Sequence, residues 1–418
     1  MNVGCMPTKT LVRSSEVAHL VKRAKEFGIE VGEITVNFEA VFARKQRILD
    51  YILDQEETLK KKDITWLRGW AKFIDNHTIE LNGEQYRAEH FVIATGSAAI
   101  VPPIPGLKEA GFWRNEEALS PPFKPQRLIC IGGGPENAEL GQVYHRLGVE
   151  VTIIQHRDRL VPMEDHEVSE ELKAIFEREG IQVLTSANVT QVRLDDNERV
   201  VSVEVDGRRE ELRADAILVA TGRRPVVEGM GLENAGVAYD LKQGIRVDEY
   251  LRTTAPNIWG AGDSSGSPML AHRAGYDAEL IALNAFKGAN KKADYTPLPW
   301  AIFTDPPIGH VGLTEAQARE KGYQVKTGIY RYTDIGKAIA MGEEEGFCKL
   351  VVDGATDNLL GAHIIGAHGD DIVHEAVLTM TSGSTVRLLE DLKSTHIHPT
   401  LSEIIARAAE DVPKHPES

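Results

Sequence analysis

The feature that most constrains this chain is a run of three glycines between a strand pattern and a helix pattern. The apolar run Leu128–Ile131 precedes Gly132-Gly133-Gly134, and residues 135–147 then have the spacing of a helix. The alternation continues with strand, helix and strand patterns at residues 149–154, 166–179 and 182–184. Alternating strands and helices predict a βαβαβ block built on a parallel sheet.

The glycine run indicates what this block binds. Glycines at such a turn let the backbone approach a pyrophosphate, and the N-terminus of the next helix offers free N–H groups and a positive dipole end. We therefore predict a dinucleotide site that includes Gly132 and Gly134; an ordinary glycine turn is the alternative. Asn137 stands where the third glycine of the G-x-G-x-x-G pattern would be. We expect the helix to lie slightly farther from its strand for that reason.

The residues after the second strand bear on which dinucleotide binds. An acid normally stands at this strand end when NAD is used, because it binds the ribose 2′-OH. Here Gln155 takes that position, and Arg157 and Arg159 follow. Guanidinium groups can hold a 2′-phosphate through paired hydrogen bonds. We predict that NADP is preferred over NAD and that Arg157 contacts it, with Asp158 opposing this preference; a solvated charged loop is the alternative.

The remaining patterns flank this block on both sides. We predict helices at 5–28 and 37–62, strands at 71–74, 78–81 and 90–94, a two-armed antiparallel hairpin at 189–213, a strand at 216–220 and a helix at 270–287. From Pro297 onward, mixed strands and helices predict an α+β domain.

Composition and charge exclude several classes of function. The 418 residues carry 47 basic and 63 acidic side chains, a net charge of −16, which disfavours a nucleic-acid partner. No apolar run approaches the ~18 residues of a membrane span, and no signal peptide is visible. The three cysteines lie far apart, which favours neither a disulfide framework nor a zinc site and suggests the cytoplasm. Cys130 and Cys348 lie in apolar runs and are predicted to be core residues.

Three further motifs carry chemistry. Gly260-Ala261-Gly262-Asp263 follows a strand and places a carboxylate where ligand hydroxyls can donate to it. Cys5 begins a helix, whose dipole stabilises a thiolate, and Lys9 lies one turn further on the same face; an unremarkable cysteine is the alternative. His398 precedes Glu403 by five residues, so the carboxylate can orient the imidazole.

The histidines give no metal-ligand pattern. A lone H-x-H such as His396-Ile397-His398 is usually structural, and no partners for a two-histidine site can be identified. His363, His368 and His374 are interpreted as polar residues of an interface. We therefore predict no metal site.

In this order, the motifs resemble those of the flavin-dependent pyridine nucleotide–disulfide oxidoreductases, over essentially the whole chain. The resemblance implies an α/β fold with two Rossmann-like nucleotide-binding domains, of which the FAD domain is incomplete, and a C-terminal α+β dimerisation domain. It implies an FAD-binding domain at 1–106, an NAD(P)-binding domain at 107–238, a central FAD domain at 239–296 and an interface domain at 297–418. The motifs are Asn2–Lys9, Ala94–Gly96, Gly132–Gly134, Ala220–Pro225, Gly260–Asp263, Asp305–Thr314 and His398–Thr400.

The resemblance also implies roles for individual residues. Cys5 matches the cysteine in charge-transfer contact with the flavin, Lys9 the lysine near the flavin, and Glu139 its partner. His398 matches an acid–base histidine supplied by the other subunit of a homodimer, with Glu403 as its orienting carboxylate. The implied cofactor-binding residues are Thr95, Gly96, Gly132, Gly134, Glu139, Arg157, Gly222, Gly262 and Asp263.

Two departures from the family pattern shape the functional hypothesis. The first redox cysteine and the upstream FAD-binding βαβ unit would stand before Met1, so we expect Met1 not to be the natural start and the chain as written to be impaired. No cysteine follows Cys348, unlike the C-terminal pair of true mercuric reductases. We predict a mercuric-reductase-like FAD- and NAD(P)H-dependent enzyme with a disulfide or metal-ion acceptor. Dihydrolipoamide dehydrogenase and an inactive nucleotide-binding dimer are the alternatives.

Overall fold

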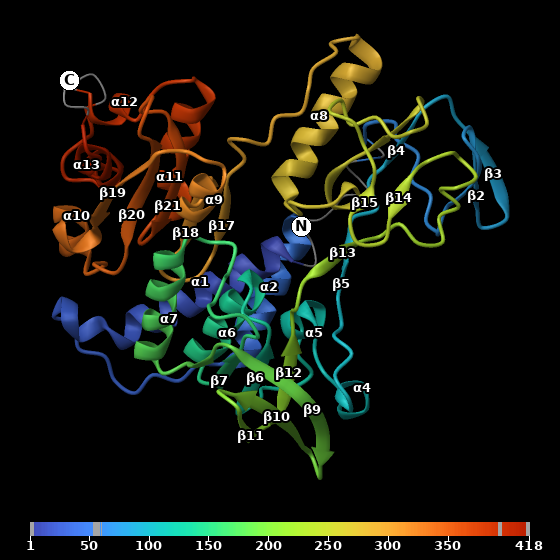
Figure 1. Cartoon of the computed structure of the whole chain (residues 1–418). Helices are drawn as coiled ribbons and strands as arrows, with labels where there is room; N and C mark the ends of the chain where they lie inside the picture. The colour runs from blue at the N-terminus through green and yellow to red at the C-terminus, as the bar shows by residue number, and fades with distance from the viewer. Residues whose placement is uncertain (1–3, 53–58, 60, 392–394, 415–418) are drawn as a thin grey trace. The chain divides into compact units, whose positions relative to one another are not determined.

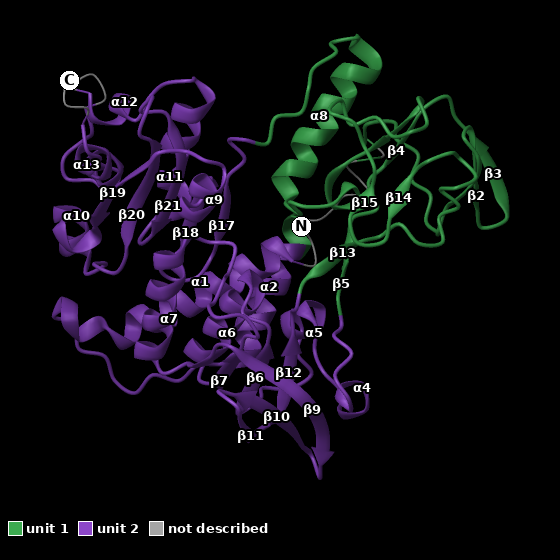
Figure 2. Ribbon diagram, viewed as in Figure 1, with its two compact units in different colours: residues 1, 50–100, 222–295 green, residues 2–49, 101–221, 296–418 purple. Residues whose placement is uncertain are grey.

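The structure is a computed structural model that describes residues 4–52, 59, 61–391 and 395–414 (Figure 1). The chain forms two compact units (Figure 2). Unit 1 comprises residues 1, 50–100 and 222–295, and unit 2 comprises residues 2–49, 101–221 and 296–418. Each unit is therefore assembled from segments that lie far apart in the sequence.

A four-stranded parallel sheet in unit 2 confirms the predicted βαβαβ block. The strand order is β12-β6-β7-β8, and every neighbouring pair is parallel. Strands β6 and β12 are apolar and almost fully buried, as expected for a sheet covered on both faces. The elements are β6 (Arg127–Ile131), α6 (Pro135–Arg146), β7 (Glu150–Ile154), α7 (His166–Glu179), β8 (Gln182–Leu184) and β12 (Ala216–Val219).

The predicted hairpin at 189–213 is wrong, because this segment forms three strands. The antiparallel sheet has the order β11-β10-β9, with β9 at Ala187–Asp195, β10 at Glu198–Val205 and β11 at Arg208–Ala214. Tight turns separate the strands, and Asp196, Asp206 and Gly207 adopt positive φ angles of 54°, 50° and 72°. Asp-Gly is a strong hairpin signal that the pattern analysis overlooked.

The C-terminal part of unit 2 is an α+β layer pair, as predicted. Its five-stranded antiparallel sheet has the order β17-β18-β21-β20-β19. Helix α11 packs against β18 and β21, and α13 packs against β19. The elements are β17 (Trp300–Ile302), β18 (Ile308–Gly312), α9 (Glu315–Glu320), β19 (Val325–Arg331), α10 (Gly336–Met341), β20 (Phe347–Asp353), β21 (Leu359–Ile365), α11 (Gly369–Thr381), α12 (Arg387–Glu390) and α13 (Glu403–Asp411).

Two N-terminal helices pack on the parallel-sheet layer. Helix α1 (Cys5–Lys22) packs against α6, and a 3-10 turn then ends at Gly28, whose φ is 73°. Helix α2 (Phe38–Ile52) places Phe38 with its ring centroid 5.9 Å from that of Tyr144 on α6. Both helices were predicted; most of the later part of the 37–62 pattern, residues 53–58 and 60, lies outside the described residues. The short helices α4 (Leu107–Ala110) and α5 (Asn115–Leu119) were not predicted.

Unit 1 is built from short strands and one long helix. Its described sheets are β1-β2-β3, the parallel pair β16-β4, and the antiparallel pairs β13-β5 and β14-β15. The elements are β1 (Lys72–Asp75), β2 (Thr78–Leu81), β3 (Glu84–Arg87), β4 (Phe91–Ile93), β5 (Ser97–Ala99), β13 (Arg223–Pro225), β14 (Tyr239–Asp240), β15 (Gly244–Ile245), β16 (Ile258–Gly260) and α8 (Ala271–Lys287).

Two cysteines belong to the core of unit 2. Cys130 and Cys348 have no exposed surface, which confirms their prediction as core residues. Burial raises the pKa of the Cys130 thiol to about 12, and it also raises the pKa of Cys348. None of the helices in the described part of the chain combines the length and the apolar character that crossing a bilayer requires.

Candidate functional site

The glycine loop of unit 2 is shaped by close backbone packing on one side and open space on the other. Gly132 has a φ of 104°, and a Cβ at this position would lie 2.5 Å from the carbonyl oxygen of Ala220. A Cβ at Gly133 would lie 2.8 Å from the Cβ of Gln155. At Gly134, by contrast, no described atom lies within 4 Å of such a Cβ. The open side therefore lies at the residue that precedes helix α6, where free N–H groups suit a phosphate.

Asn137 has a role that the sequence analysis missed. Its side chain is fully buried, and its Nδ2 donates to the carbonyl oxygens of Ile131, at 2.9 Å, and Gly132, at 2.7 Å. The asparagine thus ties the first turn of α6 to the end of β6. A glycine at this position would allow close packing but could make neither bond. The strand-to-helix connection is therefore held by hydrogen bonds where the fingerprint uses a small residue.

The loop after β7 presents one arginine to solvent. The Gln155 side chain is buried, and its Nε2 donates to the carbonyl oxygen of Arg159 at 3.3 Å. Arg159 also contacts Asp158, with its Nη1 3.3 Å from the Asp158 Oδ2. The Arg157 side chain is exposed, while its carbonyl oxygen accepts from the Ser186 N–H at 2.7 Å. The backbone of Arg157 is therefore held by a hydrogen bond, and Arg157 follows β7, the strand that pairs with β6.

A buried carboxylate joins α1, α6 and the segment after β17. The Lys9 Nζ lies 2.7 Å from the Oε2 of Glu139, whose side chain is only 6% exposed. The other oxygen of Glu139, Oε1, accepts from the Phe303 N–H at 2.9 Å. The Lys9 ammonium also lies 4.2 Å from the centroid of the Phe303 ring. The structure thus brings together Lys9 and Glu139, which the sequence places 130 residues apart.

Cys5 is the first residue of the helix that carries Lys9. All three cysteines are free thiols, but only Cys5 is exposed. The backbone of α1 starts at Gly4, whose carbonyl oxygen accepts from the Thr8 N–H at 3.1 Å. A thiol at a helix N-terminus benefits from the positive end of the dipole as a thiolate. Cys5 is therefore an exposed thiol at the N-terminus of α1.

The His398–Glu403 pair lies at the start of α13. The His398 Nδ1 lies 3.0 Å from the Glu403 Oε1, and the imidazole is 78% exposed. The Thr400 N–H donates to the other oxygen of Glu403 at 2.9 Å. Burial acts to raise the pKa of Glu403, but the hydrogen bonds from Thr400 and His398, together with the charges of His398 and Arg407, outweigh it, and the pKa lies below its usual range. An ionised Glu403 fixes the proton on Nδ1 and leaves Nε2 of a neutral His398 free to accept one.

Unit 1 gathers the other predicted cofactor-binding residues where two parallel strands end. Strands β4 and β16 are parallel neighbours, so the loops at Thr95-Gly96 and at Gly262-Asp263 begin at the same sheet edge. The Asp263 Oδ2 accepts from the Ser97 hydroxyl at 2.6 Å, and the Arg223 Nε donates to that hydroxyl oxygen at 2.8 Å. Sequence analysis missed Ser97 and Arg223, although Ser97 directly follows the Thr-Gly pair.

The glycines of this edge serve backbone geometry. Gly96 and Gly222 have φ angles of 72° and 121°, and a Cβ at Gly262 would lie 2.8 Å from the Cβ of Ala274 on α8. The Gly262 N–H donates to the buried Asp277 Oδ2 at 2.8 Å. The Thr95 hydroxyl donates to the carbonyl oxygen of Val226 at 2.6 Å. The Thr95 hydroxyl therefore stabilises the loop by its bond to Val226. Asp263 supplies the carboxylate that lies in the loop after β16 and contacts Ser97.

The residues present fit the two cofactors that the sequence resemblance implies. Open space at Gly134 before α6 suits the pyrophosphate of a nicotinamide dinucleotide, with Arg157 as the cation near its ribose. A half-buried Asp263 carboxylate at the carboxyl ends of parallel strands suits the hydroxyl-bearing part of FAD. When bound, FAD supplies two-electron chemistry that links a nicotinamide to a thiol or disulfide.

Comparison with known proteins agrees with this assignment. Residues 1–278 match the family described as pyridine nucleotide-disulphide oxidoreductase, and residues 298–409 match its dimerisation domain. A mercuric reductase of Bacillus cereus is 35% identical over 95% of this chain, which spans 63% of that relative's length. A mercuric reductase of Staphylococcus aureus is 34% identical over 98% of this chain and 75% of its own. A dihydrolipoyl dehydrogenase of Thermus scotoductus is 38% identical over 99% of this chain and 89% of its own.

A solved structure shares the fold over nearly the whole chain. The Cu(II) complex of the HOCl-induced flavoprotein disulfide reductase RclA from Escherichia coli superposes with a TM-score of 0.85 at 26% identity. The match covers 98% of this chain and 89% of the reductase. These findings confirm the predicted fold class, and the family uses FAD and NAD(P)H. The chain belongs to the pyridine nucleotide-disulphide oxidoreductases.

Proposed function

We propose that this chain passes electrons from NAD(P)H through FAD to a redox-active cysteine pair that includes Cys5, and on to a disulfide or metal-ion acceptor. The observation that carries the proposal is the Lys9–Glu139 contact on the helix that begins with Cys5. Glu139 is buried and holds the Lys9 ammonium, so α1 is tied to α6 one turn after the exposed thiol. The thiol itself lies at the N-terminus of α1, and such a position favours the thiolate, which is the reactive form of cysteine.

The nucleotide site is proposed at the glycine loop and Arg157. Gly132 and Gly133 let the loop pack, and Gly134 leaves its face open to a pyrophosphate. Gln155 places no charge where an acid would repel a 2′-phosphate, and Arg157 stands free to contact one. NADPH is therefore the proposed donor in preference to NADH. FAD would be held in part by Asp263, with Thr95, Gly96, Gly222 and Gly262 shaping the strand ends.

His398 is proposed as the acid–base residue, supplied to the site of the other subunit. The Nδ1 of its exposed ring is bonded to Glu403, so Nε2 is the nitrogen that can carry a proton to or from a substrate. The matched dimerisation domain supports a homodimer. When a disulfide acceptor is cleaved, the thiolate that leaves takes up a proton, and a protonated His398 would deliver it from Nε2.

Two substrate classes are proposed, in order, the first an electron acceptor and the second an electron donor. Mercuric reductases among the relatives favour a metal ion or a related soft acceptor. The identity to a dihydrolipoyl dehydrogenase, 38%, favours a dithiol substrate as the second candidate. The two differ in direction, because a lipoamide-type enzyme oxidises a dithiol with NAD⁺, whereas a metal-ion reductase consumes NADPH.

The test measures the two half-reactions of the flavin-loaded enzyme separately. We expect His398→Ala to slow turnover with disulfides or Hg(II) at least ~100-fold, the low end for a general acid or base. Flavin reduction by NADPH should stay within twofold of wild type. His368→Ala, which alters another exposed histidine, is the matched control. Equal slowing of both half-reactions would contradict the role of His398, and a screen without any NAD(P)H-dependent acceptor would contradict the proposed function.

A further inference from the structure

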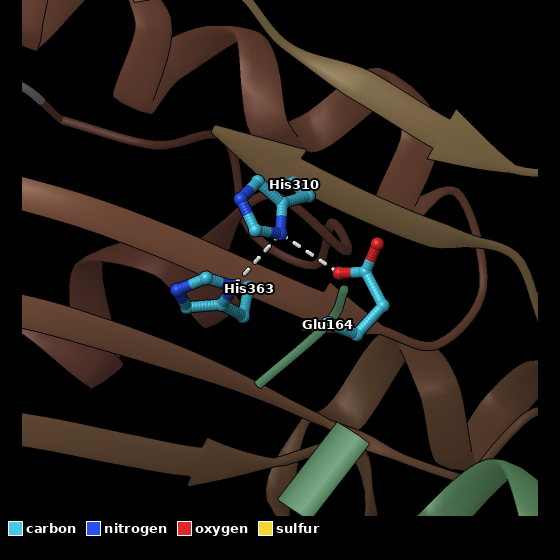
Figure 3. Close-up of side chains that lie close together, drawn as sticks. All are labelled: Glu164, His310 and His363. Carbon is cyan, nitrogen blue, oxygen red and sulfur yellow. Dashed lines mark hydrogen bonds and ion pairs between the residues drawn. The ribbon is translucent and has the colours of Figure 1, made fainter. Parts of the chain in front are cut away.

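Unit 2 buries two histidines and a glutamate in one cluster, and none of them takes part in the proposed reaction (Figure 3). Glu164 lies between β7 and α7, His310 lies on β18 and His363 lies on β21. β18 and β21 pair His310 directly with His363. Both imidazoles have no exposed surface, and Glu164 is 2% exposed. The cluster is therefore closed to solvent.

Three potential ligand atoms lie close together. The His310 Nδ1 lies 2.8 Å from the Glu164 Oε2 and 3.2 Å from the His363 Nδ1 (Figure 3). All three atoms lie within 4.8 Å of one another. A carboxylate oxygen and two imidazole lone pairs repel at such distances unless a proton or a cation lies among them. The arrangement therefore provides a place for a positive ion.

The outer atoms of the three side chains are already bonded in the way that metal ligands are. The His310 Nε2 faces the carbonyl oxygen of Gly312 at 3.1 Å, and the His363 Nε2 faces that of Leu313 at 3.0 Å. A carbonyl only accepts, so each Nε2 carries a proton and each Nδ1 of a neutral ring keeps its lone pair. The Trp300 Nε1–H donates to the other oxygen of Glu164 at 2.5 Å. Such outer bonds fix ring orientation and tautomer at metal sites.

We propose that Glu164, His310 and His363 bind a divalent transition metal, with Zn²⁺ as the ion that fits best. Imidazole nitrogens and a carboxylate oxygen are ordinary zinc ligands, at about 2.0–2.2 Å. In a tetrahedral site at such distances, two ligand atoms lie roughly 3.3 Å apart. The 3.2 Å between the two Nδ1 atoms fits this value. The Glu164 oxygen would move outward by about half an ångström.

The site joins parts of the chain that are distant in sequence. Glu164 is 146 residues from His310, which is 53 residues from His363. A bound ion would tie the segment before α7, in the layer of the parallel sheet, to β18 and β21 of the C-terminal sheet. Because the ligands are closed to solvent in the folded chain, the ion is taken up as the chain folds. We therefore expect a structural ion that stabilises unit 2.

The first test is the zinc content of the whole chain produced in zinc-supplemented medium. All proteins carry Cys5→Ser, so that the exposed thiol binds no metal. We expect close to one zinc per chain in this background and at least ~10-fold less after His363→Asn. The control His368→Asn removes an exposed histidine, 60% exposed, next to the same sheet and should keep the zinc. Equal zinc in the two histidine variants, or no zinc in the background protein, overturns the proposal.

A second measurement needs no variant of the cluster, in case His363→Asn fails to fold. X-ray absorption at the zinc edge of the Cys5→Ser protein should show nitrogen and oxygen neighbours at about 2.0–2.1 Å, with the outer-shell pattern of imidazole. Removing zinc by unfolding in chelator and refolding should lower the melting temperature, and added Zn²⁺ during refolding should restore it. A spectrum without imidazole neighbours, or a melting temperature that is the same with and without zinc, overturns the proposal.

Discussion

Replacing Glu139 by glutamine isolates the charge interaction between Glu139 and Lys9, on the helix that begins with Cys5. The Lys9 Nζ lies 2.7 Å from the Glu139 Oε2, and the carboxylate is 6% exposed while Lys9 is 31% exposed. Glutamine keeps an oxygen to accept from the Phe303 N–H but loses the charge. Hydrogen bonds to a charged group contribute about 1.5–3 kcal/mol. Lys9 is partly hydrated and keeps its contact with the Phe303 ring, so we expect a loss near the lower end of that range.

Urea unfolding followed by far-ultraviolet circular dichroism measures this loss. The matched control is Glu410→Gln, which breaks the 2.8 Å pair with Arg407 on the surface, where both partners are 49% exposed. Exposed pairs of this kind contribute about 0.2–1 kcal/mol. We expect Glu139→Gln to destabilise the chain by roughly 1.5–2 kcal/mol and Glu410→Gln by less than about 0.5 kcal/mol. Equal losses for the two variants would refute the argument that burial makes the Lys9–Glu139 ion pair stronger than an exposed pair.

Three further predictions follow from the described geometry. In the reduced native protein at pH 8, iodoacetamide should label Cys5 alone, because burial raises the pKa of Cys130 to about 12 and covers Cys348; three labels per folded chain would contradict this. Arg157→Ala should lower kcat/KM for NADPH by roughly ten- to hundredfold and leave NADH nearly unchanged, so an equal loss with both would contradict the 2′-phosphate contact. Gly133→Ala should destabilise the chain by about 1–3 kcal/mol in thermal unfolding, since its methyl group meets Gln155 at 2.8 Å, and an unchanged melting temperature would contradict the packing argument.

The parts of the fold that sequence predicts well are those in which local pattern and tertiary environment agree. The βαβαβ block was predicted because strands β6, β7 and β8 are short apolar runs and the glycines mark the turn. The three strands at 187–214 were predicted as two because β11 (Arg208–Ala214) is mostly charged and shows little alternation of apolar residues. The second turn could have been recognised from Asp206 and Gly207, because these residue types favour the positive φ angles of a tight turn.

Site residues could be predicted where they belong to a sequence motif. They could not be predicted where only the fold brings residues from distant segments into contact. Lys9 and Glu139 were paired by the resemblance to the family. The spacing of residues along the chain alone could not have predicted their 2.7 Å contact. Phe303 and the hydrogen-bonding role of Asn137 were missed because a backbone N–H and a side-chain amide have no sequence signature. His310 and Glu164 were not singled out, because each looks like an ordinary polar residue within its own segment. His363 was interpreted as an interface residue, which is wrong because the chain itself buries its imidazole completely.

The measurement that tests the central claim most directly is an anaerobic titration of the flavin-loaded enzyme with NADPH. The proposed cysteine pair stores electrons beyond those held by the flavin. Cys5 is one of its members, and the titrated protein has to include the other, which the family pattern places before Met1. We predict that wild type takes up one more hydride equivalent per flavin than Cys5→Ser, and that the additional uptake appears as thiols that react with a maleimide. Identical uptake by the two proteins, with full flavin bleaching in both, would show that Cys5 is not part of the electron path.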